Sequence, residues 1–135
     1  MKTDEKTENT SATIANLIGD SGNELFVTSG GGEFYGEAEA LLDRLYAFEK
    51  GELTAKELPK YFENTSVAKL SDIDGDGDLD IFVGGAAVSN DFGKLPSSYF
   101  IYYSSTTLLL YRYYVATLSL LQTSIVYYIL QYYNL

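Results

Sequence analysis

Residues Asp72 to Asp80 read Asp-Ile-Asp-Gly-Asp-Gly-Asp-Leu-Asp, and the run Ile81-Phe82-Val83-Gly84-Gly85 follows directly. Side chains at alternate positions of a tight loop can turn inward together. Four of them could gather their oxygens around one point: Asp72, Asp74, Asp76 and Asp80. Calcium binds six to eight oxygen ligands at about 2.3–2.6 Å in flexible geometry. The stretch therefore predicts a calcium site.

The residues around this acidic loop (72–80) predict a hairpin rather than an EF-hand. The EF-hand pattern requires Gly at position 6 and a bidentate Glu at position 12. Counted from Asp72, position 6 is Gly77, but position 12 is Val83. The β-branched and aromatic residues after the loop favour a strand, and residues 67–70 before it favour another. We therefore expect the loop to join two strands.

A weaker copy of the same pattern lies 56 positions earlier. The shift aligns Leu25-Phe26-Val27 with Ile81-Phe82-Val83. It also aligns the oxygen-bearing residues Asn16, Asp20 and Glu24 with Asp72, Asp76 and Asp80. Ile18 stands where the third-position carboxylate belongs, and Gly22 replaces Asp78. A turn without metal is the favoured interpretation of this copy, with a metal on its three remaining oxygen donors as the alternative. An internal repeat of this kind indicates a repeat architecture.

The acidic loop and the Ile-Phe-Val-Gly-Gly run after it resemble the calcium loop of VCBS/FG-GAP repeats, the blades of integrin-α-type β-propellers. Those loops bind through side chains at positions 1, 3, 5 and 9 and a main-chain carbonyl at position 7. The resemblance implies these ligands: Asp72, Asp74, Asp76, Asp80 and the carbonyl of Asp78. Residues 43–53, beginning Asp-Arg-Leu-Tyr, are similar to the outer part of a blade in cartilage-acidic-protein-like VCBS proteins. Ser98-Tyr99-Phe100 falls near Arg44-Leu45-Tyr46 with a shift of about 54.

These patterns together predict an all-β, antiparallel fold of about two blades of a β-propeller, as a fragment of a longer ring. Residues 14–102 would form two partial repeats. Residues 1–13, charged and rich in Thr, would be a disordered lead-in. Residues 37–42 favour a short helix, residues 43–53 a strand, a tight turn and a second strand, and residues 53–59 a connection between blades.

Composition narrows the function. The 135 residues include no Cys and no His, which removes thiol nucleophiles, zinc-thiolate sites and Ser-His-Asp chemistry. The formal net charge is −10, and every acidic residue lies at or before Asp91. Phosphate would be repelled by such a surface, so nucleic-acid binding is not expected. Divalent cations suit it better.

Residues 103–135 differ from the rest of the chain, because they contain no acidic residue, no Gly, no Pro and a single Arg. Three interpretations stay open. Tyr113 to Tyr133 is a run of 21 uncharged residues, long enough to cross a bilayer as a helix. The content of β-branched and aromatic residues favours ordinary strands instead. The third interpretation is a shift of reading frame near Tyr102, since charge, turns and repeat are lost together.

We expect a non-catalytic, calcium-binding structural module of an exported interaction or adhesion protein. One alternative is an accessory blade of an exported polysaccharide-active enzyme, in which paired carboxylates could act as acid and base. Another is a module tethered to a membrane by residues 103–135. The resemblance implies an extracellular or cell-surface location and, for the complete propeller, a protein or carbohydrate ligand. The N-terminal residues lack the apolar segment of a signal peptide.

Overall fold

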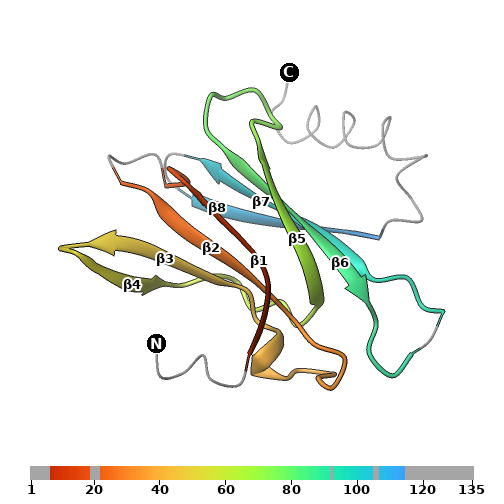
Figure 1. Cartoon of the computed structure of the whole chain (residues 1–135). Helices are drawn as coiled ribbons and strands as arrows, with labels where there is room; N and C mark the ends of the chain where they lie inside the picture. The colour runs from red at the N-terminus through yellow and green to blue at the C-terminus, as the bar shows by residue number, and fades with distance from the viewer. Residues whose placement is uncertain (1–6, 19–21, 92, 105–106, 115–135) are drawn as a thin grey trace.

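The protein is all-β and folds as two antiparallel sheets of four strands each (Figure 1). The structure, a computed structural model, describes residues 7–18, 22–91, 93–104 and 107–114. The strands are β1 (Glu8–Ala15), β2 (Glu24–Gly30), β3 (Arg44–Glu49), β4 (Glu52–Lys56), β5 (Asn64–Ser71), β6 (Asp80–Ala87), β7 (Ser97–Ser104) and β8 (Thr107–Tyr114). In each sheet every strand pairs with the next along the chain, in the orders β1-β2-β3-β4 and β5-β6-β7-β8.

The internal repeat predicted from the sequence is present in the strand register. Ile14 pairs with Leu25 in the first sheet, and Leu70 pairs with Ile81 in the second, both displaced by 56 positions. β1 and β5, and likewise β2 and β6, begin 56 positions apart. The two sheets are therefore copies of one unit.

The third strands follow a slightly different spacing. Val27 pairs with Arg44, and its equivalent Val83 pairs with Tyr99. The shift between β3 and β7 is thus 55 rather than about 54. With this shift, Ser98 is the repeat equivalent of Asp43. After β3 the chain turns through Lys50 and Gly51, whose φ values of 53° and 85° fit a two-residue hairpin of the kind that matches strand twist. The predicted strand, tight turn and strand are confirmed.

The lead-in is shorter than predicted, because β1 begins at Glu8. This strand is mostly exposed, so its residues show little of the apolar alternation that marks a strand in sequence. It is held by pairing with β2 along its length and by the hydroxyl of Thr10, which donates to the carbonyl oxygen of Thr65 at 2.8 Å. Pairing with β2 and a hydrogen bond to the second sheet thus hold residues that composition alone marks as disordered.

Two further boundaries differ from the prediction. The short helix is a single 3₁₀ turn, Glu39–Leu41, with buried Leu41 at its end. The connection between the sheets starts later than residue 53, since β4 extends to Lys56 and pairs with β3 throughout. Residues 53–56, which the sequence assigned to the connection before Pro59, therefore belong to β4.

Part of the stretch at 103–135 completes the second sheet. β8 pairs with β7 from Ser97↔Tyr114 to Ser104↔Thr107, so the strand hypothesis holds for residues 107–114. Within the part of the chain that the structure describes, no helix is long and apolar enough to cross a membrane. The remainder of the proposed span, residues 115–133, lies outside the described residues.

The core lies between the two sheets, where β5 runs beside β1 and β2 (Figure 1). Both sheets contribute one apolar face to it. The buried cluster consists of Leu17, Phe26, Leu45, Ala68, Ile81, Val83, Tyr99 and Ile101. Face-to-face packing of this kind is how a sheet buries its apolar side.

Asp43 joins the two sheets beside this core. Its Oδ1 accepts the Ser29 N–H at 2.7 Å and the Thr65 hydroxyl at 2.8 Å, and its Oδ2 accepts the Tyr99 hydroxyl. Burial raises the pKa of Asp43 from 3.8 to about 6, although these hydrogen bonds and Arg44 oppose the shift. This role is not predicted from the sequence, where the one available signal is an acidic residue directly before a strand.

Candidate metal site

The acidic loop leaves β5 after Ser71 and enters β6 at Asp80, so it is a hairpin connection as predicted. Two glycines give the loop its path. Gly75 and Gly77 have φ values of 79° and 97°, in the left-handed region that other residues adopt only with strain. A Cβ at either position would meet no atom within 4 Å, so the backbone angle alone selects glycine there.

Asp72 organises the first half of the loop around its own carboxylate. Its Oδ1 accepts the Gly75 N–H at 2.7 Å, and its Oδ2 accepts the Gly77 N–H at 3.2 Å. An Asp side chain that bonds the backbone a few residues ahead folds the chain back in a tight turn. Asp74 repeats the motif on a smaller scale by accepting the Asp76 N–H at 3.2 Å.

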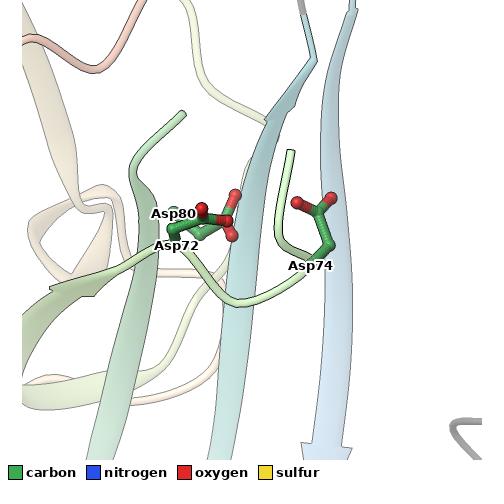
Figure 2. A group of neighbouring side chains, drawn as sticks. All are labelled: Asp72, Asp74 and Asp80. Atoms are coloured by element: carbon green, nitrogen blue, oxygen red, sulfur yellow. The ribbon is translucent and has the colours of Figure 1, made fainter. Parts of the chain in front are cut away.

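Three carboxylates converge in this loop: Asp72, Asp74 and Asp80. One oxygen from each lies within 4.8 Å of the other two. Figure 2 shows the side chains of Asp72 and Asp80 close together, and that of Asp74 farther along the loop. Asp80 is fully buried at the first position of β6, whereas Asp72 and Asp74 are exposed. The candidate site thus has one carboxylate anchored in the sheet and two supplied by the loop.

The anchor is fixed by the backbone. Asp80 Oδ2 accepts the N–H of Ile73 at 2.7 Å, which ties the start of the loop to its end. Partial desolvation raises the pKa of Asp74, and the neighbouring carboxylates of Asp80 and Asp76 add to the rise while the Asp76 N–H opposes it. The loop therefore holds negative charges close together, an arrangement that a cation would relieve.

The remaining two predicted ligands lie differently. Asp76 is exposed and is not among the three converging carboxylates; its Oδ1 accepts the Asp78 N–H at 2.9 Å. Asp78 is half-buried; the resemblance implies a role for its main-chain carbonyl, and here its N–H serves to position Asp76. The sequence predicted the position of the loop between two strands, but alternate spacing could not show which of its carboxylates converge.

The degenerate copy of the loop has an equivalent buried carboxylate as its anchor. Glu24 is buried at the first position of β2, and its Oε2 accepts the N–H groups of Leu17 at 2.7 Å and Ile18 at 3.2 Å. Leu17 and Glu24 correspond to Ile73 and Asp80, 56 positions later. Asp20 lies outside the described residues. Among the residues that are described, a close group of three metal-binding side chains occurs only in the acidic loop.

The donors in the acidic loop are all carboxylate oxygens, the ligands preferred by calcium and magnesium rather than by zinc or copper. Comparison of the chain with protein-family models, curated proteins and solved structures found no match.

Proposed function

We propose that the chain is a calcium-binding structural repeat module, without catalytic activity, of an exported interaction or adhesion protein. The observation that supports it is the convergence of the Asp72, Asp74 and Asp80 carboxylates within 4.8 Å on a loop with a set backbone path. Resemblance of the loop to VCBS/FG-GAP repeats supports the same proposal. The ion would be a structural ligand rather than a reagent.

The donor set fits calcium better than magnesium. Calcium accepts irregular shells of six to eight oxygens, whereas magnesium requires a near-octahedral shell and retains several waters. A carboxylate oxygen has two acceptor sites, so Asp72 can keep its bonds to Gly75 and Gly77 and still bind an ion. Asp76 and the carbonyl of Asp78 would complete the shell after small rotations within the same loop.

Binding would stabilise the junction of the two sheets. Leu79, in the loop, lines a cavity of about 240 Å³ together with Leu17 from the β1–β2 connection, Leu45 of the first sheet and Ile81 of the second. An ion held by the residues on both sides of Leu79 would fix that side chain against the core. Because the folded loop binds the ion and the unfolded chain does not, stability rises by RT ln(1 + [Ca²⁺]/Kd).

The test is a calcium titration of the full chain by calorimetry and by thermal unfolding. For a Kd of about 10⁻⁴ M, typical of the tighter extracellular modules, calcium at 100 times the Kd stabilises by about 2.7 kcal/mol. Asp74→Ala removes both side-chain oxygens of one converging carboxylate and should greatly reduce the response. The matched control is Asp91→Ala at an exposed Asp outside the loop, which should leave the response intact.

Two results would refute the proposal: a melting temperature of the native chain that changes with neither calcium nor chelator, or an equal calcium response in Asp74→Ala and Asp91→Ala. Magnesium at the same concentration is a second control. We expect it to produce a smaller shift, because the three carboxylates lie on a hairpin loop rather than in an octahedral frame.

A further inference from the structure

Each sheet uses one face in the core and has a second face directed away from it. Directly paired residues share a face of the sheet, as do alternate residues of a strand. In the first sheet the core face carries Phe26 and Leu45, and in the second it carries Ile81 and Ile101. The opposite faces also carry apolar side chains, beside at least one charged residue each: Arg44, paired with Val27, in the first sheet and Lys69, paired with Phe82, in the second.

The opposite face of the first sheet, here called the Ile14 face, carries Ile14, Leu25, Tyr46 and Phe48. Leu25 pairs with Ile14 on one side and with Tyr46 on the other. Ile14 and Phe48 are 66% and 65% exposed, and Leu25 and Tyr46 are half-buried. Three of these positions correspond to residues of the second sheet that lie in or against the core between the sheets: Leu70, Ile81 and Ile101.

The opposite face of the second sheet, here called the Phe82 face, carries Phe82, Phe100 and Tyr102. The ring centroids of Phe82 and Phe100 are 5.1 Å apart, and those of Phe100 and Tyr102 are 5.9 Å apart. All three side chains are only half-buried. Their equivalents in the first sheet are Phe26, Leu45 and Ala47, which are 0%, 6% and 7% exposed.

We propose that a second copy of this chain docks its Ile14 face onto the Phe82 face, so that the interface between the two sheets of one chain recurs between chains. Each face carries apolar side chains at the positions that its repeat equivalent buries in the intramolecular interface. Contiguous exposed apolar surface of this kind marks interaction sites. The contact joins two different faces, so it is head-to-tail and builds a ring or a filament rather than a two-fold dimer.

Polar residues beside the core follow the same repeat. Ser98 occupies the position of Asp43, and its Oγ accepts the Gly85 N–H at 3.2 Å, as Asp43 accepts that of Ser29. Arg44 occupies the position of Tyr99 and donates to Asn9, the equivalent of Thr65. In the docked pair, Ser98 of one copy would therefore face Arg44 of the next. A serine hydroxyl can accept from a guanidinium, so this pairing is compatible with the contact.

The experiment measures the molar mass of the full chain by sedimentation velocity over a range of concentrations, in 0.5 M NaCl to screen the net charge of −10. We expect concentration-dependent assembly. The double variant Ile14→Lys/Phe48→Lys blocks the Ile14 face, and Phe82→Lys blocks the Phe82 face. Each should weaken association roughly 30-fold or more, the usual effect of losing a central apolar contact.

Mixing the two blocked variants is the decisive step. Each retains one intact face, so a head-to-tail contact gives a heterodimer that stops at two chains. Leu95→Lys, an exposed apolar residue on neither face, is the control and should assemble like the native chain. Circular dichroism checks folding, and Tyr102→Lys replaces Phe82→Lys if the latter unfolds.

Three outcomes would overturn the proposal. A native chain that remains monomeric across the concentration range would exclude self-association. Assembly unaffected by the Ile14→Lys/Phe48→Lys variant would place the contact elsewhere. Blocked variants that fail to combine when mixed would indicate an interface between identical faces instead of the head-to-tail contact.

Discussion

The two loops that open β2 and β6 are the most instructive comparison in the molecule. Both end in a buried carboxylate at the first position of a central strand, Glu24 in one and Asp80 in the other. Both carboxylates accept a backbone N–H from seven residues earlier at 2.7 Å. The loops differ in what precedes the anchor, since Asp72 and Asp74 have Asn16 and Ile18 as equivalents.

The difference separates two roles that the repeat pattern combines. The anchor carboxylate belongs to the fold, because it satisfies backbone donors whether or not other carboxylates are near. The carboxylates at the first and third positions belong to the proposed ion site, because they add negative charge that the fold does not require. A loop can lose the second role and keep the first.

The largest expected effect comes from removing Glu24, the anchor of the loop in which the described residues form no close group of metal-binding side chains. Glu24→Ala leaves the Leu17 and Ile18 N–H groups without their acceptor, and at about 1–3 kcal/mol per unsatisfied donor the loss should be about 4 kcal/mol. Urea unfolding measures it. Glu24→Gln, which keeps an acceptor oxygen, should lose much less, and the Glu24→Ala deficit should be equal with calcium and with chelator. A deficit that calcium restores would assign an ion to this loop.

The next effect concerns Asp43 and its repeat equivalent, the neutral Ser98. The pKa of Asp43 is about 6 in the folded chain and near 3.8 when exposed. The folded state therefore keeps the Asp43 carboxyl protonated to a higher pH than the unfolded state does. The resulting stabilisation is complete below about pH 4 and is lost as pH rises through 6. The total is about 3 kcal/mol, at 1.36 kcal/mol per unit.

Asp43→Asn removes the pH-dependent contribution of Asp43 to stability and keeps its hydrogen bonds. The amide can accept from Ser29 and Thr65 and donate to the Tyr99 oxygen. The difference in unfolding free energy between the native chain and Asp43→Asn should therefore favour the variant progressively from pH 4 to pH 7. Ser98→Ala should show no such trend. Parallel pH profiles for the native chain and Asp43→Asn would contradict the assignment.

The smallest effect concerns the glycine path of the acidic loop. Gly77→Ala places a side chain at φ 97°, which costs about 1–2 kcal/mol, although no atom lies within 4 Å of the new Cβ. Gly32→Ala, where the space is equally open and φ lies outside the left-handed region, is the matched control and should change stability little. Thermal unfolding without calcium compares them. Equal effects would mean that the loop adapts its backbone.

The sequence predicted the parts of the fold that local pattern controls. Leu25-Phe26-Val27 and Ile81-Phe82-Val83 share both composition and spacing, so the repeat and its central strands can be recognised from the order of the residues alone. Five closely spaced carboxylates identified the candidate site for the same reason. Features formed by residues fewer than about ten positions apart can therefore be predicted from the sequence.

Features that depend on distant partners could not be predicted in this way. Composition predicts a disordered lead-in where β1 lies, because the exposed residues of this strand carry no apolar period and part of its support comes from Thr65. The sequence around Asp43 does not predict its hydrogen bonds to Thr65 and Tyr99 across the junction between the sheets. Asp76 turned toward the Asp78 N–H, a local choice among several that the spacing allows equally.

The order of the strands has a consequence for how the chain folds as it is synthesised. Every strand pairs with its neighbour in sequence, so contacts within a sheet are local and can form rapidly. The first sheet is complete by Lys56, before any of β5 has been made. Phe26 and Leu45 then remain exposed to water until the second sheet has been synthesised and packs over them. That interval is when the nascent chain is most exposed to aggregation, and when a chaperone would have the most to protect.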